Sequence, residues 1–119
     1  RYAEAVDRHG NTPLHLLVER RPYRLKELEA VQCILKAYPA AASMRNHDGF
    51  EPLLLAIHNK IPWQNGLGEI AQADTSVCTR HDATTGLYPF QLAASVGGPD
   101  ALNTTFHLLS LLPEVIQYQ

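Results

Sequence analysis

Histidine and cysteine are the residues of this chain that could hold a metal ion, and it has six of the first and two of the second. Zinc sites are usually built from closely spaced pairs, such as H-x-x-x-H or C-x-x-C, because one helix or turn then aims both side chains at the ion. The sequence contains neither of these pairs, so we expect no metal site and no cofactor. The six histidines are His9, His15, His47, His58, His81 and His107. For the three near the predicted turns, His9, His47 and His81, a solvated polar edge is a better interpretation than a metal site.

A catalytic nucleophile needs a general base and an orienting group held close to it. Neither Cys33 nor Cys78 has a histidine at motif spacing, and the sequence contains no G-x-S-x-G. The Gly-Leu-Gly at residues 66–68 lacks the third glycine and the preceding strand of a dinucleotide-binding fingerprint, so it is interpreted as a helix start. Glu27 and Glu29 would point to different sides of a helix rather than act as a pair. We therefore expect no enzyme activity and no small-molecule substrate.

Composition limits the possible partners. A chain of 119 residues that is 45% hydrophobic and 18% charged is typical of one ordered domain. Its net charge of -2 lacks the basic excess with which proteins bind nucleic acids, so no nucleic-acid partner is expected. Basic residues gather only at residues 20–26, where Glu19, Glu27 and Glu29 are interleaved, which predicts a solvated helix face.

The lengths of the apolar runs and the surroundings of the cysteines indicate the cellular compartment of the protein. No apolar run is long enough to span a membrane, so no membrane insertion is expected. Nothing at the N-terminus resembles a secretory signal. Cys33 and Cys78 stand among apolar or small neighbours, which favours buried thiols over a disulfide. These features indicate an intracellular, cytoplasmic protein.

A repeated pattern of glycine, two residues and proline divides the chain into three units. The glycines stand at positions 10, 49 and 86 and the prolines at positions 13, 52 and 89, so both recur at intervals of 39 and 37 residues. An apolar run follows each proline. Such a period indicates units that bury their apolar faces by stacking. The predicted units are residues 7–45, 46–82 and 83–119 within one domain, residues 1–119.

Each unit is predicted to begin with a turn and a helix. Glycine supplies the positive φ of a tight turn, and proline three residues later suits the first position of a helix. Thr12 can cap the first helix through its hydroxyl, whereas Glu51 and Tyr88 provide weaker caps. The third turn, at residues 82–86, carries one extra residue.

A second helix is predicted in each unit, followed by an extended spacer at residues 39–42, 74–77 and 113–116. Truncating Ile34 or Leu109 on these helices to alanine is expected to cost roughly 2–5 kcal/mol, as for buried residues. The apolar faces at helical spacing are Leu25, Leu28, Val31, Ile34 and Leu35; then Leu67, Ile70 and Ala71; then Leu102, Phe106, Leu109 and Leu112.

Residues 7–15, Asp-Arg-His-Gly-Asn-Thr-Pro-Leu-His, resemble the ankyrin signature Asp-x-x-Gly-x-Thr-Pro-Leu-His. The resemblance is looser over the rest of the chain: Leu17 replaces the usual alanine, and both intervals exceed the family period of about 33 residues. It implies an all-α fold, an ankyrin-repeat solenoid of about three stacked helix-loop-helix units with extended finger loops. It also implies a structural role for His15, hydrogen-bonded within and between fingers. Because both ends fall inside the pattern, we expect a piece of a longer array.

Ankyrin repeats usually bind other proteins through their fingertips and first helices, so the resemblance implies a protein–protein interaction module with a protein partner. Phe50 with Leu87 would be its apolar centre; equally, Phe50 would pack on a neighbouring finger or on Leu87. Thr84 and Val96 extend this surface. The partner-binding residues expected from the resemblance are Arg8, His9, Asn11, Glu19, Arg20, His47, Asp48, Phe50, His58, Asn59, Leu87 and Ser95.

The fingers also carry basic residues. His9, His47 and His81, each near an arginine (residues 8, 45 and 80), predict a weakly basic, pH-sensitive strip that suits an acidic partner with an apolar side chain. The alternative function is a structural subunit or spacer packed permanently into a larger assembly. Apolar surface left exposed after stacking, at Leu108, Leu111 or Val115, would favour that alternative.

Overall fold

The computed structural model describes residues 6–82 and 85–112 of the chain. These residues form six α-helices and three short 3₁₀ helices, with no strand among them, so the described part of the protein is all-α. The elements in chain order are α1 (Pro13–Val18), α2 (Leu25–Ala37), η1 (Pro39–Ser43), α3 (Pro52–His58), η2 (Trp63–Asn65), α4 (Leu67–Ala73), η3 (Thr75–Thr79), α5 (Pro89–Val96) and α6 (Ala101–Ser110).

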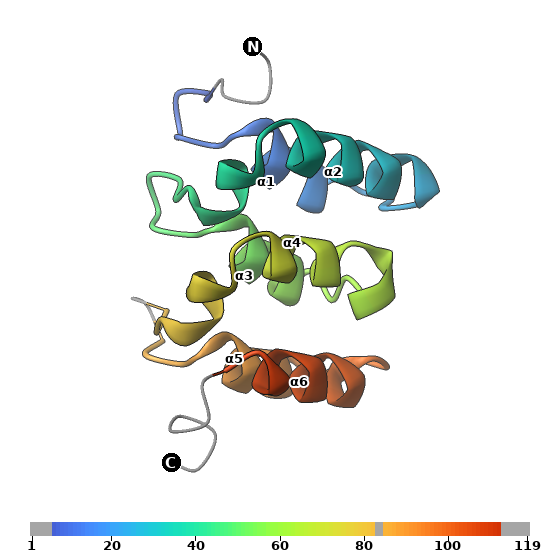
Figure 1. Cartoon of the computed structure of the whole chain (residues 1–119), viewed down its shortest axis with the longest axis vertical. Helices are drawn as coiled ribbons and strands as arrows, with labels where there is room; N and C mark the ends of the chain where they lie inside the picture. Colours follow the sequence, from blue (N-terminus) through green and yellow to red (C-terminus); the bar gives the residue numbers. More distant parts are fainter. Residues whose placement is uncertain (1–5, 83–84, 113–119) are drawn as a thin grey trace.

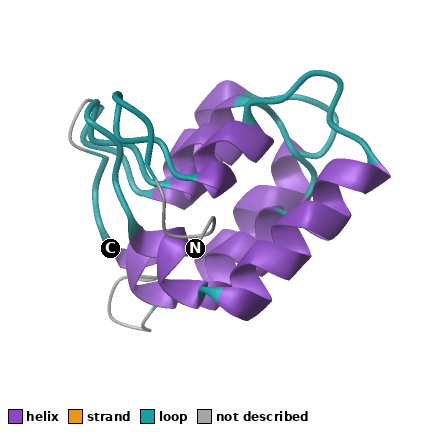
Figure 2. Ribbon diagram, turned by 90° about the horizontal axis from the view of Figure 1, so that it is seen from above, coloured by secondary structure: helices purple, strands orange, loops and turns teal. Residues whose placement is uncertain are grey.

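The α-helices are arranged as three pairs, α1 with α2, α3 with α4, and α5 with α6, which lie one below another along the long axis (Figure 1). The first helices α1, α3 and α5 pack in succession, and α2 packs on α4, whereas α6 has its main contacts with α5 and η2. Seen from above, the helices form two layers and the loops gather at separate edges (Figure 2). One of these edges carries the loops that precede α1, α3 and α5, which we call fingers 1, 2 and 3.

The predicted helix starts are confirmed. Proline is the first residue of α1, α3 and α5, where its missing N–H leaves no bond unmade. Thr12 caps α1, since its hydroxyl accepts a hydrogen bond from the N–H of His15. Glu51 forms no side-chain cap on α3. At α5 the cap comes from inside the helix instead, because Gln91 Oε1 accepts the Tyr88 N–H at 3.0 Å.

The spacers differ from the expected extended form. Residues 39–43 and 75–79 form the 3₁₀ helices η1 and η3, which bury Ala41, Ala42, Val77 and Cys78 against the stack. A 3₁₀ turn lets these small residues face inward while satisfying part of the backbone locally. The spacer predicted at residues 113–116 lies outside the described residues.

The core runs through all three pairs. Leu14, Val31, Leu53, Leu67 and Leu108 are almost completely buried within it. Apolar side chains that are removed this completely from water supply most of the stability of such a stack.

Two predicted apolar faces are partly wrong. Leu25, Leu102 and Phe106 are 66%, 85% and 68% exposed, while Ile34 and Leu109 are only half-buried. α6 turns Thr104 and Leu108 inward because its neighbours are α5 and η2, and the side that carries Leu102 and Phe106 does not face them. The apolar spacing correctly predicted a helix there but not the face that it buries.

Each of the three fingers is closed by an equivalent backbone hydrogen bond. The N–H of Asp7 donates to the carbonyl of Asn11, and the N–H of Asn46 donates to that of Phe50, both four residues on. In finger 3 the N–H of Asp82 reaches Leu87, five residues on. The extra residue predicted in finger 3 is therefore confirmed.

Replacing Gly10 with alanine is expected to cost about 1–3 kcal/mol of unfolding free energy, since the added methyl combines left-handed strain with overpacking. Gly10 has φ +79°, and a Cβ there would stand 2.9 Å from the backbone nitrogen of His47. Gly49 is the matched control: its φ is +86°, but a Cβ would meet nothing within 4 Å. Chemical denaturation should show the larger loss for Gly10→Ala. Equal losses would mean that fingers 1 and 2 are not packed this closely.

Candidate functional site

Fingers 1 and 2 are joined along their length. The N–H of His47 donates to the carbonyl of His9 at 2.8 Å, and Asn46 Nδ2 donates to Asn11 Oδ1 at 2.9 Å. These bonds place His47 directly against Gly10. The exposed tips therefore bring together four of the predicted partner-binding residues, Arg8, His9, His47 and Asp48.

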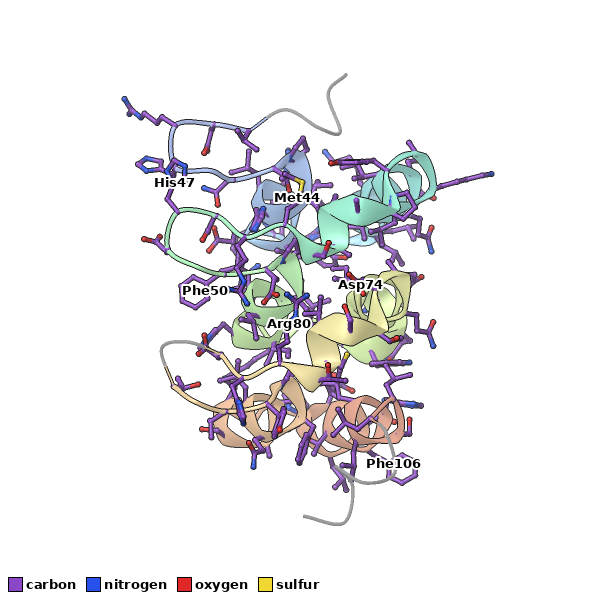
Figure 3. All side chains as sticks on the ribbon, turned by 60° about the vertical axis from the view of Figure 1, so that its left-hand side comes forward. Met44, His47, Phe50, Asp74, Arg80 and Phe106 are labelled. Carbon is purple, nitrogen blue, oxygen red and sulfur yellow. The ribbon has the colours of Figure 1, made fainter. Side chains whose placement is uncertain are left out.

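Phe50 lies at the base of finger 2 with a fully bonded backbone. Its N–H donates to Asn46 Oδ1 at 3.0 Å, and its carbonyl accepts from the Asn46 N–H at 2.9 Å and from His15 Nε2 at 2.8 Å. The ring is half-buried and meets His58 edge-on, with centroids 6.3 Å apart. His47 and Phe50 lie on the same side of the molecule, far from Phe106 (Figure 3).

We call this region the finger surface: Arg8, His9, His47, Asp48, Phe50 and His58. The ring of Phe50 packs against the core yet keeps some exposure, so its role as the apolar centre of an interface stays a prediction. Leu87 is likewise half-buried and packs against the core. Glu19 and Ser95 are exposed at the ends of α1 and α5. Thr84 lies outside the described residues.

His15 holds the base of the finger surface in place. The side chain is completely buried, and its Nδ1 accepts the N–H of Thr12 at 3.0 Å. Its Nε2 faces the carbonyl of Phe50, which can only accept, so the proton is assigned to Nε2 and the ring is neutral. Burial lowers the pKa of His15, although the bond to Phe50 and the charges of Glu19 and Asp7 act in the opposite direction.

Several predicted binding residues are instead used inside the fold. Asn59 Nδ2 donates to the carbonyl of Val18 at 3.0 Å and so ties α3 to the end of α1. The amide oxygen of Asn11 is occupied by Asn46. Arg20 Nε lies 3.1 Å from Glu27 Oε2. These three side chains serve contacts between elements, which leaves less of them for a partner.

The predicted solvated face at residues 19–29 also needs correction, because Glu27 is buried. Glu27 Oε1 accepts the N–H of Arg24 at 2.9 Å, which caps α2 from inside, while the other oxygen pairs with Arg20. The backbone hydrogen bond from Arg24 lowers the pKa of Glu27, and the charge of Arg20 adds to this effect. Glu29, two residues on, is exposed, as expected for the other side of the helix.

The predicted basic strip is wrong for two of its three arginines. Arg45 and Arg80 both turn toward the buried Glu51, with nitrogen–oxygen distances of 3.6 and 3.5 Å to Oε2. These distances are too long for direct hydrogen bonds, so the pairs are mainly electrostatic. His81 packs its ring on Tyr88 at 4.1 Å. Only Arg8 remains as an unpaired arginine beside the finger histidines in the described part of the chain.

Comparison of the chain with family models, with curated proteins and with solved structures gave no match. Within residues 6–82 and 85–112, no helix is both long and apolar enough to cross a membrane.

The residues that could bind a metal or act as nucleophiles form no recognisable site in the described ranges. No group of three or more histidine, cysteine or acidic side chains gathers there in a way that could hold a metal ion. Both cysteines are free: Cys78 is buried as expected, but Cys33 is exposed on α2, contrary to expectation. Burial raises the pKa of the Cys78 thiol to about 11, so this thiol is protonated at neutral pH and a poor nucleophile.

Proposed function

We propose that this chain is a protein-binding module of divergent ankyrin type, which holds a partner protein at the finger surface and catalyses no reaction. The signature at residues 7–15 and the arrangement of the fingers support this assignment. We propose an intracellular location on the basis of the two free cysteines.

The observation that carries the proposal is the fixed backbone beneath a partly exposed aromatic ring. Phe50 uses both of its backbone groups in three hydrogen bonds, one of them from the buried His15. An anchor that is already ordered loses little conformational entropy on binding. Aromatic side chains in such positions are typical binding hot spots.

The rim of the finger surface defines the partner's chemistry. Arg8 supplies a permanent positive charge, and His9, His47 and His58 supply hydrogen-bonding groups; His58 is the one that meets the Phe50 ring. Asp48 is the one acid among the six residues. A partner that presents an apolar side chain flanked by acidic groups would complement this surface.

Phe50→Ala is expected to weaken capture of the partner about thirtyfold, the loss that removal of a hot spot of 2 kcal/mol produces. Immobilised parent and variant chains would be incubated with extract from the source cells, and retained proteins would be quantified by mass spectrometry. Phe106→Ala is the matched control, because it removes an exposed aromatic ring far from the finger surface.

Arg8→Glu tests the charge of the finger surface. It is a better charge reversal than Arg20→Glu, which would also break the salt bridge to Glu27.

A partner lost with Phe50→Ala or Arg8→Glu, but kept with Phe106→Ala, supports the finger surface. The opposite pattern would support the alternative function, a subunit packed permanently into an assembly. One observation favours that alternative: α6 exposes Leu102 and Phe106 on one side. Of the positions expected to mark it, Leu108 is buried, Leu111 is half-buried and Val115 lies outside the described residues.

A further inference from the structure

The edge of the molecule opposite the fingers contains two adjoining cavities. This loop edge comprises residues 19–24, between α1 and α2, and residues 59–66, between α3 and α4 (Figure 1). Tyr23 Oη donates to the carbonyl of Asn65 at 2.7 Å and joins the two loops. Tyr23 and Asn65 line both cavities, so this bond lies between them.

The two cavities differ in chemistry. The first, of about 180 Å³, is lined by Leu25 and Leu28 with Arg24, and Leu25 is 66% exposed beside it. The second, of about 230 Å³, is flanked by the cations Arg21 and Lys60. The remaining lining residues of the second cavity are Asn59, Ile61 and Pro62.

The loop edge has an excess of positive charge. No carboxylate lines either cavity, and Arg21, Arg24 and Lys60 form no ion pair with any described residue. Within the loop edge Glu19 is the one acid, and it lines neither cavity. Two further acids of the first two helix pairs are already engaged: Glu27 pairs with Arg20 and caps α2, and Glu69 accepts a hydrogen bond from Gln32 at 2.9 Å. Asp100 lies on the other side of Lys60, in a separate small cavity of about 20 Å³. Unpaired cations beside a concave surface attract an anionic ligand.

We propose that the loop edge is a second binding site, which takes an extended acidic peptide segment of a partner protein. An apolar side chain would enter the first cavity against Leu25 and Leu28, and a neighbouring carboxylate would lie between Arg21 and Lys60. The flat surfaces of Tyr23 and Pro62 would support the peptide between them. The site shares none of the six residues of the finger surface, so it does not depend on the function proposed above.

The probe is the acetylated, amidated peptide Asp-Glu-Leu-Asp-Glu, titrated into isotopically labelled protein and followed by amide chemical shifts. We expect the largest shifts at Tyr23 and Asn65, from which the affinity of the loop edge is read. Any binding of the peptide to the finger surface is followed separately at Phe50. Two control peptides separate the contributions: Asn-Gln-Leu-Asn-Gln removes the charge, and Asp-Glu-Ala-Asp-Glu removes the apolar side chain. Both should bind at least tenfold more weakly. If the alanine peptide bound as tightly as the first peptide, the loop edge would be a simple anion site. If the neutral peptide bound as tightly, charge would make no contribution to binding. Either result overturns the proposal.

The double variant Arg21→Glu, Lys60→Glu should weaken binding of the first peptide at least tenfold. Its matched control, Lys26→Glu with Lys36→Glu, makes the same charge change at exposed positions of α2 that line neither cavity and should alter the affinity less than twofold. Leu25→Ala, at a largely exposed position, tests the first cavity without disturbing the core. Equal weakening by both double variants, or shifts centred on the fingers, would contradict the loop-edge site. Phe50→Ala should leave this affinity unchanged, which separates the test from that of the finger surface.

Discussion

Replacing His15 with alanine is expected to lower the free energy of unfolding by about 4 kcal/mol, because one buried and one partly buried hydrogen bond lose a partner at about 1–3 kcal/mol each and a cavity remains. The buried N–H of Thr12 would be left without its acceptor, and the carbonyl of Phe50 would lose the Nε2 donor. Urea denaturation followed by circular dichroism measures this loss. His9→Ala is the control, since that side chain is exposed and should change stability by less than about 0.5 kcal/mol.

The same residue should make stability depend on pH. Burial lowers the folded-state pKa of His15 below the ordinary value of 6.5, so the unfolded chain takes up the proton first as the pH falls. The stability contributed by neutral His15 is therefore complete above about pH 6.5 and declines as the pH falls through the folded pKa. His15→Gln cannot titrate, so the parent should lose more stability than this variant between pH 7.5 and 5.5. Equal losses in both proteins would contradict a buried neutral imidazole.

The parts of the fold that were predictable are those encoded within a few residues. A glycine with positive φ at position 10, proline at the first helical position and the Thr12 cap are local arrangements that the sequence specifies directly. The extra residue of finger 3 was also visible, because it lengthens a short pattern that the other two fingers define. Local chemistry of this kind is independent of how distant segments pack.

Contacts between distant segments were not predictable. Glu51 is paired with Arg45 and Arg80, and Asn59 bonds the end of α1, 41 residues away, yet no spacing in the sequence signals either arrangement. A glutamate directly before Pro52 was interpreted as a weak helix cap, whereas burial requires that its charge be compensated. The candidate site residues at the fingertips are exposed, as a binding surface requires, whereas Asn11, Arg20 and Asn59 are used to hold elements of the fold together.

The positive charge of the loop edge was also not predictable from the sequence. The basic residues at 20–26 were visible in the sequence, and with their interleaved glutamates they predicted a solvated helix face. In the structure one glutamate turns inward to cap α2 and pair with Arg20, which leaves Arg21 and Arg24 without an ion-pair partner among the described residues. The direction of each side chain decides which charges pair with one another, and charge composition alone does not reveal that direction.

The buried face of α6 gives the second large expected effect. Leu108→Ala should cost about 2–5 kcal/mol, because the side chain is 1% exposed and its removal leaves a cavity against α5. Leu102→Ala, on the same helix but 85% exposed, should change stability by less than about 0.5 kcal/mol. The stability loss for Leu109→Ala should fall between these two values, because this side chain is half-buried rather than part of the core. Thermal and urea denaturation of the three variants would test this order. A larger loss at Leu102 than at Leu108 would mean that α6 buries the face that carries Leu102 and Phe106.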